Sequence, residues 1–303
     1  MNFNDIIFPK IMKGVKQLFI ASLLLMFFAC NSLKKLETTQ SSAQAAYESA
    51  NYSEALTLYE QLIQLYKDNG KDIPVDIKMN AGKSAYEIKN YDIAKGYLTE
   101  VFKENKNVEP LMMLIDISKQ SGSRDELKSL IENHTELLKE NGEGDFANTE
   151  LFNINYSKGD MEVAYSNYNS IENPDKELFD EYLNILMDLD KKKEAKQSCI
   201  EALKSDDSNV AALEWLAIDE YTNAENWYKS MMAKYNKNKN ATSYAYLRRD
   251  LKKVSVQYRG ARDKFLKLRD IDPDNKKYIR YLENCYLRLE VKDKAAEMDR
   301  LLK

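Results

Sequence analysis

The sequence contains few side chains of the types that usually carry out chemistry. His134 is the only histidine in the chain, so a hydrolytic triad or a His-rich metal site would depend on it alone. It lies in a polar segment, residues 132–135, which favours a solvent-exposed side chain. No glycine-rich phosphate loop, HExxH motif or EF-hand spacing occurs. We therefore expect a protein that is not an enzyme and that binds no metal and no cofactor.

The three cysteines divide into one near the N-terminus and two within the body of the chain. Cys199 and Cys285 are separated by 86 positions (285 − 199), and neither has a CxxC partner or a nearby histidine. This spacing is a weak basis for a metal or redox site. We expect two buried free thiols, and a disulfide between them is the alternative in an oxidising compartment.

The third cysteine, Cys30, follows a segment with the features of an export signal. Three lysines at positions 10, 13 and 16 precede an apolar run from Leu18 to Phe28, and Ala29 comes directly before the cysteine. The run is shorter than the roughly 20 apolar residues that a membrane-spanning helix needs. It fits the apolar region of a secretory signal over residues 1–29. An uncleaved signal anchor is the alternative.

These residues resemble the signal peptide of a bacterial lipoprotein, in which a small residue precedes an acylated cysteine. The resemblance implies that Cys30 carries lipid such as palmitate and becomes the mature N-terminus. Residues 30–40 are then the lipidated cysteine and a tether. By the same resemblance, Asn31 after the cysteine implies sorting to the outer membrane of a Gram-negative bacterium. Lys34 and Lys35 favour an orientation toward the periplasm.

Composition indicates a helical protein with an uneven charge distribution. Apolar residues make up 44% of the chain, while only 9 Gly and 5 Pro are available for the tight turns of a β protein. Residues 30–228 carry 21 basic and 38 acidic residues, and residues 229–270 carry 13 basic and 3 acidic residues. An acidic chain is a poor nucleic-acid binder, so we expect no nucleic acid. The basic band could meet an acidic partner or simply be solvated.

From about residue 41 the sequence repeats a turn, a small residue and then large apolar residues. Ala55 is followed by Tyr59 and Leu62, and Ala94 by Leu98 and Val101, which places large residues four and seven positions after the small one. This spacing is one face of a helix that begins after a turn. The equivalent small or central positions are Ala55, Ala94, Leu127, Ala164, Ala195, Tyr228, Ala261 and Ala295.

The pattern resembles the tetratricopeptide repeat (TPR), a helix–turn–helix unit of about 34 residues with a small residue where its two helices cross. The resemblance implies an all-α solenoid of about eight repeats over residues 41–303, in which neighbours bury one another's apolar faces. A generic helical bundle is the alternative, but a bundle has no reason to return one pattern at such regular intervals. Between Thr242 and Asp270 only Gly260 interrupts the helical pattern, so longer helices are expected there.

In that family, ligands usually bind along the concave face formed by the first helix of each repeat. Carrying those positions over gives a set of candidate partner-binding residues. They are Tyr47, Lys83, Tyr86, Asn153, Tyr156 and Asn184. Lys277, Arg280 and Asn284 resemble part of the family's clamp for a peptide carboxylate.

We therefore expect a lipid-anchored scaffold or adaptor that binds proteins of the cell envelope on its concave face or its C-terminal repeats. We also expect a partner contact or self-association through residues 229–303, since Leu301 and Leu302 end the last helix with no helix after them. One alternative is an outer-membrane assembly factor, by likeness to the repeat lipoprotein of the β-barrel machinery. Another is a glycan- or nutrient-capture lipoprotein that stacks sugars on Trp215 and Trp227.

The acylation site can be tested directly. Cys30→Ser removes the only thiol that follows the signal-like segment closely, so we expect the variant to lose metabolically incorporated palmitate and to leave the outer-membrane fraction. Cys199→Ser serves as the control and should keep its label. Unchanged labelling of the Cys30 variant would contradict the lipoprotein interpretation.

Overall fold

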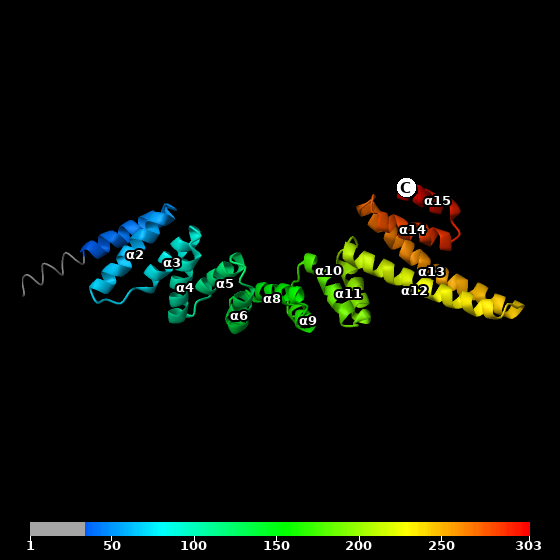
Figure 1. Cartoon of the computed structure of the whole chain (residues 1–303), viewed down its shortest axis with the longest axis horizontal. Coiled ribbons are helices and arrows are strands. Elements are labelled where there is room, and N and C mark those ends of the chain that lie inside the picture. Colours follow the sequence, from blue (N-terminus) through cyan, green and yellow to red (C-terminus); the bar gives the residue numbers. More distant parts are fainter. Residues whose placement is uncertain (1–33) are drawn as a thin grey trace, which may run out of the picture. The chain divides into compact units, whose positions relative to one another are not determined.

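The computed structural model describes residues 34–303, and it shows them as helices joined by turns, with no strand in this part of the chain (Figure 1). The predicted all-α class is therefore confirmed. The described residues divide into two compact units, with the boundary between Ile154 and Asn155. Within residues 34–303, no helix has both the length and the apolar character needed to cross a membrane. The predicted signal segment and Cys30 lie outside the described residues.

The first unit is a series of antiparallel helix pairs. It begins with a helix over residues 34–48. There follow α2 (Tyr52–Asp68), α3 (Val75–Glu87), α4 (Tyr91–Asn105), α5 (Val108–Gln120), α6 (Arg124–Asn133) and the short α7 (Thr135–Glu140). The next helix, α8 (Gly144–Lys158), runs across the boundary between the two units.

The second unit continues the succession and contains two much longer helices. Its elements are α9 (Met161–Tyr168), a 3₁₀ turn (Lys176–Leu178), α10 (Phe179–Asp188), α11 (Lys192–Ser205), α12 (Val210–Lys237), α13 (Ala241–Ile271), α14 (Lys276–Arg288) and α15 (Lys292–Leu302). The long helices α12 and α13 lie side by side as a hairpin, and α14 and α15 form the last pair (Figure 1).

The same tight turn precedes six of the eight predicted crossing residues. One residue in each turn has a left-handed backbone, with φ between 54° and 82°. The N–H of the next residue donates to the carbonyl five positions earlier, as from Asn90 to Ala85 and from Asp160 to Asn155, which satisfies a carbonyl at the helix end. The left-handed residues are Ala50, Lys89, Gly122, Gly159, Asp190 and Glu290.

These turns fix the repeat register, because each left-handed residue stands five positions before a predicted crossing residue. Ala55, Ala94, Ala164 and Ala195 are completely buried, and Ala295 is nearly so. Leu127, in a segment that fits the pattern less well, is also buried. A residue with almost no side chain lets the second helix approach the first closely, so the predicted register is correct at these positions.

The register is wrong at Tyr228. This residue lies inside the continuous helix α12, is half-buried, and follows no turn. The interval from Ala195 to Ala261 is close to the length of two repeats. This spacing is expected either from two ordinary repeats or from one repeat that contains a long insertion. The structure has the second arrangement: the first half of α12 packs with the second half of α13, around Ala217 and Ala261.

The predicted tether is also shorter than expected. Residues 34–40, which we placed in a tether, form the start of the first helix. Leu36 is only 5% exposed and belongs to the core of the first unit with Ala43. The apolar contact of Leu36 explains why the folded part begins before residue 41.

The two internal cysteines are free and buried, as predicted. His134, in contrast, is half-buried instead of exposed, with its ring set edge-on to Phe102 at 4.8 Å between centroids. Burial, together with the nearby Lys106, lowers the pKa of this histidine. The polar neighbours of His134 in the sequence therefore gave no indication of its packing against α4.

The end of the chain is partly covered. Met298 is buried and Leu302 packs against the cluster of Leu282 and Cys285, while Leu301 is 40% exposed. Of the two terminal leucines that we expected to be uncovered, only Leu301 is exposed. The buried clusters that the structure describes all lie within residues 34–303.

Close helix crossing gives a stability test. We expect Ala94→Leu and Ala164→Leu each to lower the free energy of unfolding by about 1–3 kcal/mol, since both sites are fully buried and added methylenes overpack a core. Thermal or urea unfolding followed by circular dichroism measures the loss. Ala296→Leu, at an exposed site on α15, is the control and should change little. Unchanged stability of both core variants would show that the register is wrong.

Candidate functional site

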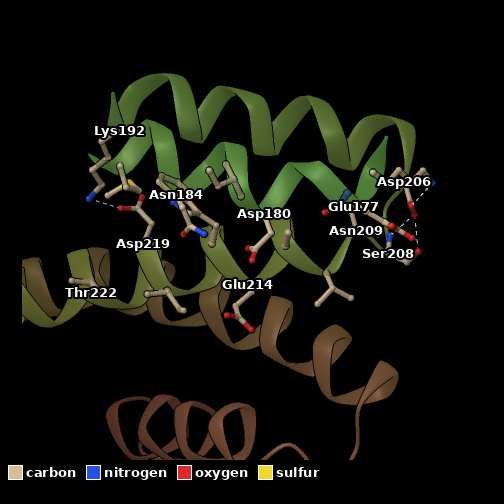
Figure 2. A pocket seen from close by; sticks show the side chains of 17 residues that line it. Glu177, Asp180, Asn184, Lys192, Asp206, Ser208, Asn209, Glu214, Asp219 and Thr222 are labelled. Carbon is tan, nitrogen blue, oxygen red and sulfur yellow. Dashed lines mark hydrogen bonds and ion pairs between the residues drawn. The ribbon is translucent and has the colours of Figure 1, made fainter. Parts of the chain in front are cut away.

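A groove with a volume of about 820 Å³ lies between α10 and the first half of α12 (Figure 2). Its residues come from corresponding faces of the two helices. On α10 they include Asp180, Asn184 and Met187, spaced by four and three positions. On α12 they include Ala211, Glu214, Trp215, Ile218, Asp219 and Thr222. Such spacing puts each set on one side of its helix, so the groove follows from helical periodicity.

The connection between α11 and α12 holds one end of the groove in place. The side chain of Asn209 accepts a hydrogen bond from the Ala212 N–H at 2.9 Å, which caps α12. Asp206 accepts bonds from both the N–H and the hydroxyl of Ser208, at 3.1 and 2.6 Å. These local bonds set where α12 begins and which of its faces lines the groove.

The groove is acidic. Two lysines and five carboxylates line it, a net charge of −3 (2 − 5). Lys176 pairs with Asp206 at 2.8 Å, and Lys192 with Asp219 at 2.7 Å. Outside these pairs, the carboxylates are Glu177, Asp180 and Glu214.

Those three carboxylates differ in how they are held. Glu214 accepts from the Lys277 ammonium at 2.6 Å and from the Tyr278 hydroxyl at 2.7 Å, so α14 closes one edge of the groove. Glu177 and Asp180 are exposed and form no ion pair with any residue in the described part of the chain. In Figure 2 the Asp180 carboxylate extends into the space between α10 and α12. The free negative charge of the groove is therefore concentrated at its α10 side.

The remaining surface of the groove is apolar. Trp215 and Ile218 on α12 are half-buried, and Met187 on α10 is 44% exposed. An exposed methionine and a half-buried tryptophan beside carboxylates offer an adaptable apolar surface with a preference for positive charge. The arrangement is suited to a segment that carries apolar side chains and positive charge.

Burial of one carboxylate marks the inner end of the groove. Asp219 is only 7% exposed, and its two oxygens face Lys192 at 2.7 Å and Lys196 at 3.8 Å. It also accepts from the Asn223 amide at 3.0 Å. Because a buried charge is costly unless paired and hydrogen-bonded, these contacts hold Asp219 as part of the wall.

Three of the five predicted partner-binding residues of the second unit line this groove or contact a residue that does. Asn184 lines it, and its amide donates to the Tyr156 hydroxyl at 3.4 Å. Lys277 contacts it through Glu214. Arg280 and Asn284 share a face of α14 with Lys277 but do not line the groove.

In the first unit, the predicted residues are mainly engaged with neighbouring helices. Lys83 pairs with Glu109 at 2.5 Å, joining α3 to α5. The Tyr86 hydroxyl donates to Asp116 at 2.6 Å, and this bond, with burial, raises the pKa of Tyr86 to about 12.

The other two candidates in the first unit differ in exposure. Tyr47 is half-buried with its ring edge-on to Tyr52, at 5.6 Å between centroids. Asn153 is exposed on α8. In this unit Lys83 and Tyr86 thus join neighbouring helix pairs, and Tyr86 lines a smaller cavity of about 240 Å³.

Sequence reasoning missed Asp180, Met187 and Glu214. A usable signal was present, because the acidic and apolar positions of α12 recur at intervals of three and four after the Asn209 cap. The two tryptophans do not form one sugar-stacking platform. Trp215 lines the groove, whereas Trp227 packs with the separate cluster around Met231.

Comparison with known proteins finds fold-level similarity to solved structures. A Bacteroides ovatus protein is 18% identical, with 76% of this chain and 100% of that chain covered and a TM-score of 0.46. The C-terminal part of a TPR repeat-containing protein from Cytophaga hutchinsonii is 15% identical, with 86% and 93% covered and a TM-score of 0.48. A TPR repeats protein from Bacteroides fragilis is 16% identical, with 83% and 98% covered and a TM-score of 0.37.

No family model matches the chain, and no curated protein matches it. The assignment of TPR-like helix pairs therefore rests on the turns and crossings described above.

The ion pair at the groove end predicts a pH effect. Lys176, with the Ser208 bonds, lowers the pKa of Asp206 from 3.8 to about 2. We expect Lys176→Ala to raise this pKa toward 3.8, as measured by carboxyl-carbon NMR titration. A depressed carboxyl pKa stabilises the fold above pH 4 or so and loses that contribution as pH falls toward 2.

The variant should therefore lose less stability between those two pH values than the parent protein. Lys193→Ala, at an exposed lysine outside the groove, is the control and should leave the Asp206 titration in place. An Asp206 pKa that stays near 2 in the Lys176 variant would show that the ion pair does not form.

Proposed function

We propose that the protein is a non-catalytic, lipid-anchored scaffold of the cell envelope that binds a protein segment in the groove between α10 and α12. The observation that carries the proposal is the groove itself, with Trp215 and Met187 beside the unpaired carboxylates of Glu177 and Asp180. The segment it fits is extended or helical, carries apolar side chains, and has a net positive charge.

Physical features of the groove support binding over catalysis. Asn184 and Thr222 add amide and hydroxyl groups along the groove, which can hydrogen-bond a peptide backbone. Cys199 is buried, and burial with the nearby Asp219, a residue of the groove, raises its pKa to about 12, so it is held as a thiol.

The envelope location is proposed from the N-terminal segment. An acyl chain on Cys30 would hold the protein at a membrane, and the periplasm-facing side of the outer membrane is the location we propose. The scaffold role and the anchor are separate parts of the proposal, since groove binding can be measured on the chain from residue 34 onward.

Peptide arrays test the groove. We expect the chain from residue 34 onward to bind peptides that combine apolar residues with lysine or arginine, and to bind weakly the same peptides with glutamate in place of the basic residues. Trp215→Ala and Asp180→Lys should each weaken binding at least tenfold or so, since truncating one buried aromatic anchor often costs about 2 kcal/mol.

Asp188→Lys supplies the matched control for charge, because Asp188 lies on the same helix as Asp180 but does not line the groove. It should bind peptides like the parent protein. Equal loss in the Asp188 and Asp180 variants, or equal binding of both peptide sets, would contradict binding in the groove.

A further inference from the structure

The long hairpin of α12 and α13 extends past the groove as a separate projection. We call residues 223–257 the basic finger. It has its own small core, in which Met231, Leu247 and Val254 are buried between the two helices. At its tip, the side chain of Asn240 accepts from the Ser243 N–H, in a capping box that starts α13. The finger is therefore an ordered helical hairpin and not a loose loop.

Positive charge dominates the finger. It carries eight basic and two acidic residues, and the stretch from Asn226 to Arg249 contains no carboxylate. All eight basic side chains are exposed. They are Lys229, Lys234, Lys237, Lys239, Arg248, Arg249, Lys252 and Lys253.

The two carboxylates of the finger neutralise little of this charge. Glu225 pairs with Arg288 of α14 at 2.6 Å and accepts from Tyr258 at 2.7 Å, so it serves the base of the hairpin. Asp250 pairs with Arg249 at 2.9 Å. The other seven basic side chains form no ion pair with the described residues.

Elsewhere in the second unit, many basic side chains pair with a nearby carboxylate. Lys294 with Glu297 and Lys303 with Asp299 are examples on α15. Positive charges gathered on one hairpin repel one another, and this repulsion favours binding of the hairpin to an anionic surface. The finger therefore differs from an ordinary solvated helix face.

Aromatic side chains near the tip add a second feature. Tyr244 is 51% exposed and Tyr246 is 56% exposed, on the first two turns of α13. The Arg249 guanidinium lies 5.2 Å from the Tyr246 ring centre, and the Tyr235 and Tyr244 rings are 6.1 Å apart. Tyrosine, with an apolar ring and a polar hydroxyl, is enriched at the headgroup level of membranes.

We propose that the basic finger docks on the surface of an anionic phospholipid bilayer, with its lysines and arginines against the phosphates and Tyr244 and Tyr246 among the headgroups. The proposal does not depend on acylation of Cys30 or on peptide binding in the groove. It assigns to the inserted hairpin a role that the repeat array alone does not provide.

The spread of charge favours a bilayer over an acidic protein. The basic residues lie on both helices and at the tip instead of around one concavity, and no cavity described in the structure is lined by them. A laterally mobile array of headgroups can match such a distribution, whereas a folded protein needs fixed complementary positions. From Asp219 to Lys237 the helix rises about 27 Å, so the finger can meet a surface while the groove remains open.

Vesicle sedimentation tests the proposal with the chain from residue 34 onward, which contains every buried cluster described. The probes are vesicles of phosphatidylcholine alone and with about 30% phosphatidylglycerol, at about 0.15 M salt. We expect binding only to the anionic vesicles. Outside the finger the protein carries a net negative charge. Electrostatic attraction of the protein as a whole would therefore not explain binding to anionic vesicles.

Two triple variants with equal changes in net charge distinguish the contribution of the finger from that of lysines elsewhere in the second unit. Lys229→Glu, Lys234→Glu and Lys252→Glu together should lower the partition coefficient at least tenfold or so, at three positions within the finger helices. Lys193→Glu, Lys204→Glu and Lys292→Glu together are the control, at exposed lysines outside the finger, and should stay within about twofold. Circular dichroism checks that both remain helical.

Replacement of the tyrosines tests their position. Tyr244→Ser with Tyr246→Ser should weaken vesicle binding by roughly threefold or more while the net charge stays the same. The proposal is overturned if the parent protein does not bind anionic vesicles, or if the control triple variant loses as much binding as the finger variant. The finger could instead mediate self-association or bind nucleic acid. Either result without vesicle binding overturns the bilayer proposal, because the finger would then bind an anionic surface other than a membrane. An unchanged partition coefficient for the tyrosine variant overturns the placement of the two rings.

Discussion

Close crossing of two helices at a small buried residue is the constraint on which each helix pair depends. The turn before the crossing must reverse the chain within about two residues, and it does so through one left-handed residue followed by a bond to the carbonyl five positions earlier. In four of these turns, at Ala50, Lys89, Asp190 and Glu290, this conformation is taken by a residue other than glycine, at a cost of roughly 1–2 kcal/mol each. Burial of the crossing residues and their large apolar neighbours outweighs that cost.

The same constraint explains where the groove lies. Once a small residue sets how closely the second helix approaches, the first helices of successive pairs are left to line the inner surface. The groove therefore uses α10 and α12, with α14 at its edge through the contact of Lys277 with Glu214. The groove is acidic because carboxylates occupy surface positions at three- and four-residue spacing on its helices. The fold tolerates acidic residues at these positions but does not require them.

Most of the fold could be predicted from the sequence because the crossing residues recur at nearly regular intervals. The inserted hairpin could not, since its length is close to one repeat and the spacing from Ala195 to Ala261 fits two interpretations. Of the binding residues proposed from the sequence, Asn184 lines the groove and Lys277 contacts its wall through Glu214, while the places of Asp180 and Met187 in it needed the three-dimensional structure. The burial of a single residue can also depend on a distant part of the sequence. His134 is half-buried because its ring packs against Phe102 of another helix, which its neighbours in the sequence do not indicate.

The separation of charge within the second unit depends on helix α12, which takes part in both surfaces. Its first half supplies Glu214 and Asp219 to the acidic groove, and its second half supplies Lys229, Lys234 and Lys237 to the finger. Because α12 is one continuous helix packed along α13, the finger cannot bend back to neutralise its own groove. Both surfaces thus remain available to other molecules of opposite charge, and a partner drawn to one is repelled by the other.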